Sequence, residues 1–111
     1  MDNPENLSIM GGCVVSNNII NGTGKLKWCV RDESANPVDS GWRFFSNIDT
    51  DEYLEDAKNM SIWNFDKIVE IEPAVLLIHD MPAGTDVALI SDGNRKFFIH
   101  SKTGLEVSAS E

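Results

Sequence analysis

The chain of 111 residues has the length of a single domain, and its 41% hydrophobic and 24% charged residues are typical of a folded globular protein. Eighteen acidic against nine basic residues give a formal net charge of −9, which disfavours nucleic acid and anionic membrane as partners. Basic proteins and cationic ligands are favoured by this charge, although solubility alone also explains it.

The N-terminal residues and the apolar runs of the chain indicate its expected cellular location. Residues 1–10, MDNPENLSIM, form a polar lead-in that we expect to be flexible, with acids where a signal peptide has basic residues. The longest apolar run, AVLLI, is far short of the roughly 20 residues that cross a bilayer. We therefore expect a cytoplasmic protein in which Cys13 and Cys29 are buried free thiols. A disulfide between them requires their strands to be neighbours.

We expect a single domain at residues 11–111. Two segments early in this domain have the pattern of β-strands. The first is the β-branched run GGCVVS at residues 11–16, and the turn sequence NGTG follows at residues 21–24. The second is KLKWCVR at residues 25–31, in which polar and apolar residues alternate. The buried face of this strand should carry three residues: Leu26, Trp28 and Val30.

The segment DSGWRFFS at residues 39–46 follows a turn-rich loop and alternates again. Trp42 and Phe44 share one face, and we expect them to pack on the helix that follows. Arg43 lies on the other face, where it should pair with acids or lie over an aromatic ring such as Phe45 or Trp28. Gly41 lets the chain enter this strand without a Cβ clash.

The next segment carries the clearest helix start in the sequence. Asp49 is predicted to be the N-cap, with Glu52 at the third helical position of a capping box. Ile48 and Tyr53 are placed to form a hydrophobic staple around that cap. The helix should end near residue 59. Four residues at helical spacing are expected to face the core: Tyr53, Leu54, Ala57 and Met60.

The second half of the chain predicts more short elements. In order these are a strand at 61–63, a helix at 65–71 and a helical element at 74–79. Pro73 separates the two helical elements. Two strand-like runs flank the dipeptide Asp92-Gly93, which predicts a hairpin, and an edge strand is expected at residues 105–107. The predicted fold is α+β: one small domain with a mostly antiparallel β-sheet and a few short helices packed on it.

Patterns of known catalytic and metal sites are missing from the sequence. Cys13, Cys29, His79 and His100 have none of the close pair spacings of a zinc site. There is no GxSxG motif, and GTGK lacks the first glycine and the Ser or Thr of a phosphate loop. Carboxylates crowded on an exposed helix are normally solvated, whereas general acid–base catalysis needs a desolvated one. We therefore expect neither an enzyme nor a metal site.

Several segments, taken in order, resemble one known family. They are GGCVVS, GKLKWCVRDE, DSGWRFFS, DTDEYLEDAKNM, IEPAVL and PAGT with KFFIH. From about residue 11 to residue 107, they resemble the bacterial immunity protein 33 family of polymorphic toxin systems, formerly a domain of unknown function. The family-motif residues, which we expect to be structural, are Trp28, Arg31, Ser40, Gly41, Trp42, Arg43 and Phe44. Trp63 departs from the family pattern, which has a small residue or cysteine there.

The resemblance implies an α+β protein without catalysis or cofactor that binds and neutralises a cognate toxin by stoichiometric protein–protein interaction. An acidic face would speed encounter with a basic toxin and exclude wrong partners. The candidate partner-binding residues are Asp49, Asp51, Glu52, Glu55, Asp56 and Trp63. In the alternative interpretation these acids only cap and solvate a helix. A ligand- or protein-binding regulatory module without a toxin is the alternative function, and an enzyme acting on a small cationic substrate is a third.

Overall fold

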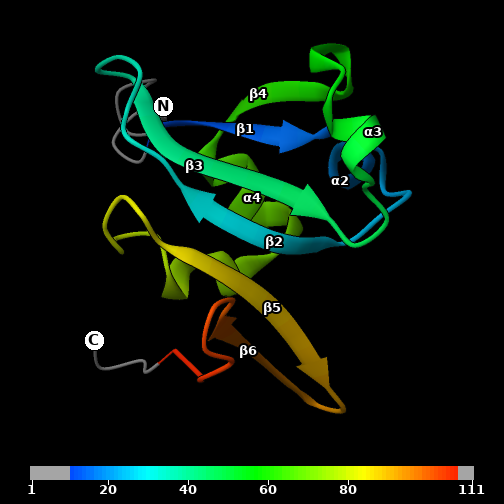
Figure 1. The fold of residues 1–111 in the computed structure, drawn as a ribbon, viewed down its shortest axis with the longest axis vertical. Helices are drawn as coiled ribbons and strands as arrows, with labels where there is room; N and C mark the ends of the chain where they lie inside the picture. The colour runs from blue at the N-terminus through cyan, green and yellow to red at the C-terminus, as the bar shows by residue number, and fades with distance from the viewer. Residues whose placement is uncertain (1–10, 108–111) are drawn as a thin grey trace, which may run out of the picture.

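The structure is a computed structural model that describes residues 11–107. The predicted lead-in at residues 1–10 lies outside the described residues. The strands are β1 (Gly12–Ser16), β2 (Leu26–Arg31), β3 (Asp39–Ser46), β4 (Met60–Asn64), β5 (Asp86–Asp92) and β6 (Arg95–His100). They form a six-stranded sheet in the order β4-β1-β3-β2-β5-β6 (Figure 1). Neighbouring strands are antiparallel except β1 and β3, which run parallel.

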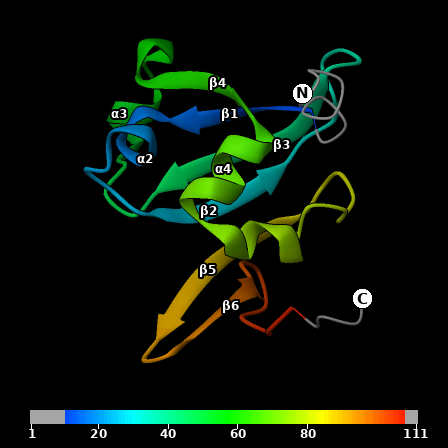
Figure 2. The same cartoon turned by 180° about the vertical axis from the view of Figure 1, so that it is seen from behind.

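Short helical segments connect these strands. They are α2 (Asn17–Asn21), α3 (Asp51–Leu54), η1 (Ala57–Asn59), α4 (Phe65–Ile71) and η2 (Pro73–Leu77). Figure 2 shows α4 and η2 lying across one face of the sheet. Figure 1 looks onto the other face, over which no helix of residues 11–107 lies. The predicted α+β fold with a mostly antiparallel sheet is therefore confirmed.

The hydrophobic core lies between the sheet and α4. The rings of Trp42 and Phe44 are stacked with centroids 5.9 Å apart, and Phe44 meets Phe65 of α4 edge to face at 5.9 Å. All three side chains are fully buried. The predicted inward face of β3 is confirmed. The prediction that its rings pack on the helix directly after β3 is wrong, because α4 covers them instead.

The predicted faces of β2 are wrong from Trp28 onward. The pairing of β2 with β3 shifts register between Leu26 and Trp28, as a β-bulge does by inserting one extra residue. The extra residue reverses the alternation, so that Leu26 and Cys29 are buried while the Trp28 side chain is 43% exposed. The Lys27 ammonium lies 5.6 Å from the centre of the Trp28 ring. Trp28 therefore faces away from the core.

The predicted helix after β3 begins one residue late and is shorter than expected. Thr50 is the N-cap of α3, and its Oγ1 accepts a hydrogen bond of 3.0 Å from the Tyr53 amide. The helix already ends at Leu54, and the separate turn η1 follows. Tyr53 and Leu54 are only partly buried and Ala57 is exposed, so this segment does not supply the core face that its spacing predicted.

The elements after β3 otherwise follow the prediction. The strand β4, the helix α4, its end before Pro73 and the β5–β6 hairpin are confirmed. The expected edge strand at residues 105–107 is reduced to one bridge between Ile99 and Glu106. The helix α2 was not predicted from the sequence. The Ser16 side chain caps it by accepting a hydrogen bond from the Asn18 amide.

Both cysteines are buried free thiols, as predicted. The strand β3 lies between β1 and β2, so Cys13 and Cys29 are not on neighbouring strands and cannot form a disulfide. Burial raises the pKa of the Cys13 thiol to about 11 and raises the pKa of Cys29 as well. Both are therefore protonated at neutral pH, which makes them poor nucleophiles.

Candidate partner-binding surface

The sheet face without a helix, which we call the open face, carries apolar side chains on several strands. Cross-strand pairs of such residues are Val14 with Ile62, Phe45 with Trp28, and Ile90 with Phe97. They alternate with the buried residues of the same strands, which places them on the open face. Ile62 is 79% exposed. Exposed apolar side chains on a sheet face without a helix over it are a feature of protein–protein interaction sites.

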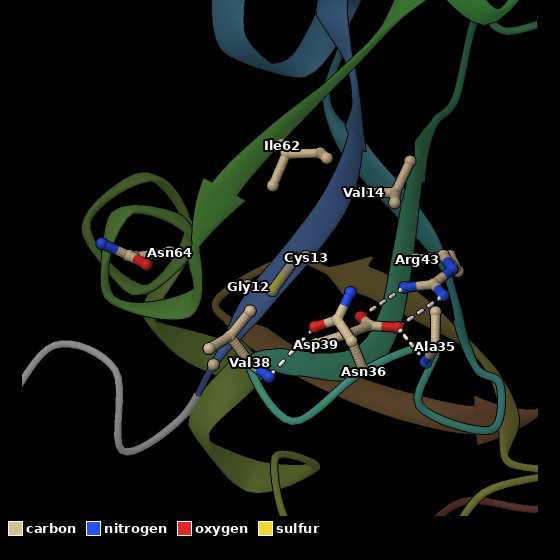
Figure 3. A pocket seen from close by; sticks show the side chains of 11 residues that line it. Gly12, Cys13, Val14, Ala35, Asn36, Val38, Asp39, Arg43, Ile62 and Asn64 are labelled. Carbon is tan, nitrogen blue, oxygen red and sulfur yellow. Dashed lines mark hydrogen bonds and ion pairs between the residues drawn. The ribbon is translucent and has the colours of Figure 1, made fainter.

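One end of the open face is hollowed where β4, β1 and β3 meet the loop at residues 32–38. The cavity, which we call the hollow, has a volume of about 320 Å³. Its apolar lining comes from Val14, Val38 and Ile62, and its polar lining comes mainly from Asp39 and Arg43. Figure 3 shows these side chains around the space, with the Asp39–Arg43 pair on the β3 side.

Arg43 and Asp39 form a bidentate salt bridge beside the hollow. Arg43 Nη1 and Nη2 donate to the two Asp39 carboxylate oxygens at 3.0 and 3.1 Å, and Arg43 Nε lies 3.5 Å from Asp32 Oδ2. The amides of Ala35 and Gly41 also donate to Asp39, at 2.8 and 2.9 Å. These bonds hold the loop against β3. The prediction that Arg43 pairs with acids is confirmed.

The Arg43 hydrogen bonds hold the pKa of Asp39 well below its usual range, with the backbone amides adding to the effect against a smaller opposing effect of burial. A carboxylate with a depressed folded-state pKa stabilises the fold above its unfolded pKa of about 3.9, and this stabilisation is lost as the pH falls through the folded value. We expect the free energy of unfolding to fall as the pH is lowered from about 5 to 2.

Asp39→Asn should reduce this decrease in the free energy of unfolding at low pH, as measured by urea unfolding at a series of pH values. Part of the slope should remain, because the pKa of Asp49 is also lowered. Asp80→Asn is the control, since Asp80 is exposed and forms no ion pair within residues 11–107. If Asp39→Asn and the wild type lose stability with the same slope, the ion pair does not carry the effect.

Several family-motif residues link strands next to the hollow. Ser40 Oγ donates to the Gly12 carbonyl at 2.6 Å and joins β3 to β1. Arg31 Nε donates to the Ser40 carbonyl at 2.9 Å, Arg31 Nη1 donates to the Met81 carbonyl at 2.6 Å, and the guanidinium lies 5.6 Å from the centre of the Trp42 ring. Together they tie β1, β2, β3 and the loop before β5 into one framework that supports the hollow.

Asp49 differs from the other predicted partner-binding acids because its carboxylate is hydrogen-bonded to neighbouring elements. Its Oδ1 accepts hydrogen bonds from the side chains of Ser46, Asn18 and Ser16 at 2.6, 2.8 and 3.0 Å, and its Oδ2 accepts from the Ser46 amide at 2.7 Å. Burial raises the pKa of this carboxyl, but these hydrogen bonds outweigh it and the net pKa is lowered. The Asp49 carboxylate joins α2 to the end of β3, which also explains why it does not cap α3.

The remaining acids of the prediction lie together on the surface. Asp51, Glu52 and Glu55 are exposed, and none of their carboxylates is in an ion pair with another part of residues 11–107. Asp56 is exposed too, and its carboxylate accepts the Lys58 amide at 2.9 Å to cap η1. We call these four residues the acidic segment.

The acidic segment borders the open face. A shallow depression is lined by Val14 and Ile62 of the sheet together with Leu54, Glu55 and Ala57. Val14 and Ile62 also line the hollow, so they lie between the hollow and the acidic segment. The surface thus combines an apolar centre with acids at its border.

Trp63, the predicted aromatic anchor, lies away from this surface. It pairs with Cys13 across β1 and β4 and points to the helix-covered side, where the Lys67 ammonium lies 5.8 Å from its ring centre. Its neighbour Ile62 lies on the open face instead, and Ile62 is not among the residues predicted from the sequence. The available signal was the period of two in β4, which places Ile62 opposite to Trp63.

Features of two other functional classes, a cluster of metal ligands and a membrane-crossing helix, are missing from the described residues. Among residues 11–107, no three His, Cys, Asp or Glu side chains are grouped as metal ligands would be. The helices in this range are also too short and too polar to cross a lipid bilayer. The expected lack of an enzyme activity, a metal site and a cofactor remains a prediction.

The family model of the immunity protein Imm33 domain matches residues 13–98. This span begins in β1 and ends in β6, so it includes most of the residues that line the hollow and the whole acidic segment. No curated protein and no solved structure matches the chain.

Proposed function

This chain belongs to the immunity protein Imm33 domain family, and we propose that it binds and neutralises a cognate toxin by stoichiometric protein–protein interaction, without catalysis. The match over residues 13–98 is the observation that carries the proposal, because it spans most of the domain. The proposed partner is a protein toxin with a basic surface, and the proposed place of action is the bacterial cytoplasm.

The surface properties support a binding role. Nanomolar affinity requires about −12 kcal/mol, and most of this energy in protein complexes comes from a few apolar or aromatic anchors surrounded by polar groups. The open face offers exposed apolar residues, and the acidic segment lies at its border. A net charge of −9 would speed the approach of a basic partner.

Co-expression with the toxin encoded by the adjacent gene tests the proposal. Cells that make the toxin should regain growth when this protein is present, and the two proteins should co-purify as a complex that salt weakens. An unrelated acidic protein of similar size and net charge is the control and should not restore growth. Failure of both growth rescue and co-purification would exclude the immunity role.

The hollow also supports one alternative function. Its volume of about 320 Å³ lies at the lower end of the range of small-molecule pockets, which fits a ligand-binding regulatory module. Such a module would leave the growth of toxin-producing cells unchanged. It would instead gain thermal stability with a small molecule that fills the hollow, and filling the hollow with Ala35→Trp should abolish that gain.

A further inference from the structure

We propose that the toxin docks on the β4–β1–β3 half of the open face and inserts an apolar side chain into the hollow against Ile62. Basic groups of the toxin around that side chain would face the acidic segment. This inference rests on the proposed function and specifies where the partner binds and what chemistry the partner presents.

The apolar part of the site is built around Ile62. This side chain is 79% exposed and lies opposite Val14, between the hollow and the acidic segment. Val38, which lines the hollow from the loop before β3, is also exposed. Interfaces gain most of their energy from central apolar side chains that fit into pockets of the partner, and the hollow is such a pocket. An apolar anchor of the partner would cover these exposed side chains.

The charges around the hollow specify a basic partner. Arg43 is the cation that lines the hollow, and its charge is paired with Asp39 and Asp32. Two carboxylates around one guanidinium leave a net negative charge on this side. On the other side of Ile62, Glu55 of the acidic segment lines the shallow depression, and its carboxylate is in no ion pair within residues 11–107. A basic protein would therefore meet negative potential at both ends of the apolar centre.

The β2–β5–β6 half of the open face fits a basic partner less well. The Lys27 ammonium lies 5.6 Å from the centre of the Trp28 ring, and the Arg95 guanidinium lies 4.3 Å from the centre of the Phe97 ring. These cations cover part of the aromatic surface. Arg95 is ion-paired with Glu106, whereas Lys27 is in no ion pair within residues 11–107 and would repel basic groups. The two halves of one sheet face thus differ in charge, and the half that contains Ile62 is the one that attracts a cationic protein.

The test is the affinity and the dissociation rate of single-residue variants with the purified product of the adjacent toxin gene, measured by surface plasmon resonance. Ile62→Ala should weaken binding by about tenfold or more, mainly through faster dissociation. Ala35→Trp should fill the hollow and weaken binding by a similar factor, since Ala35 lines it. Leu105→Ala is the matched control, because Leu105 is 67% exposed but lies beyond β6.

The outcomes separate this inference from the proposed function. Ile62 and Ala35 are exposed, so both variants should keep the wild-type unfolding midpoint, which is measured alongside binding. Tight wild-type binding that neither variant weakens, or that only Leu105→Ala weakens, would overturn the docking site and leave the immunity role standing. If the wild-type protein itself does not bind the toxin, both proposals fail.

Discussion

Gly41→Ala should destabilise the protein by about 3 kcal/mol or more, because a side chain at this position meets backbone and not a movable side chain. Gly41 has φ +89°, and a Cβ atom there would lie 2.2 Å from the Asp32 carbonyl oxygen. The Asp32 amide in turn donates to the Gly41 carbonyl at 2.8 Å, so β3 and the loop cannot separate without losing this bond. Asp32 belongs to the loop that shapes the hollow.

Gly93→Ala is the matched control for this prediction. Gly93 also has a positive φ, +63°, but no atom lies within 4 Å of the Cβ that alanine would add. The left-handed backbone alone costs a non-glycine residue about 1–2 kcal/mol. Urea unfolding of the two variants should therefore show a clearly larger loss for Gly41→Ala. Equal losses would mean that the backbone conformation, and not the clash with Asp32, determines the effect.

Reversing two charges of the acidic segment should slow toxin association by about tenfold to a hundredfold at low salt. The variant is Glu52→Lys with Glu55→Lys, since both carboxylates are exposed and neither is hydrogen-bonded to another described residue. The control is Glu70→Lys in α4, which covers the opposite face of the sheet, with Asp80→Lys in the turn after η2, and both residues are exposed. Each double variant changes the formal net charge from −9 to −5, because every reversal adds two positive charges.

Stopped-flow measurements at low and high salt distinguish a local from a global charge effect. A local effect slows only the variant of the acidic segment, and the difference between the two variants should shrink as salt screens the charges. Equal slowing by both pairs would show that net charge alone steers the toxin. Asp49 and Asp56 are kept unchanged, because their carboxylates hold the fold through hydrogen bonds to neighbouring elements.

The sequence was informative where the pattern is local and misleading where another segment determines the outcome. The alternation of β3 placed Trp42, Arg43 and Phe44 correctly, because side chains of a regular strand must point to opposite faces. The same reasoning failed in β2, since the bulge next to Trp28 depends on pairing with β3 and leaves no local mark. Asp49 is of a residue type that often caps helices, but its carboxylate is hydrogen-bonded to residues distant in sequence.

One part of the candidate site could be predicted from the sequence and the other part could not. The acidic segment was visible as a charge cluster, and its position at the surface agrees with the usual behaviour of such clusters. The hollow was not visible, because its walls come from β1, β3, β4 and the loop before β3. The predicted anchor Trp63 is next to Ile62 in the chain, yet the two point to opposite faces. One position along a strand therefore decides which of them could meet a partner on the open face.

The place of β1 inside the sheet sets the order in which a newly made chain can fold. Gly12 in β1 pairs with Asp39 of β3 on one side and with Asn64 of β4 on the other. A ribosome must therefore release the chain past β4 before the first strand has both neighbours, and contacts so distant in sequence slow folding. A nascent chain that stalls before β4 would expose one edge of β1 to other proteins. Under the proposed function, protection of the cell would begin only after this delay.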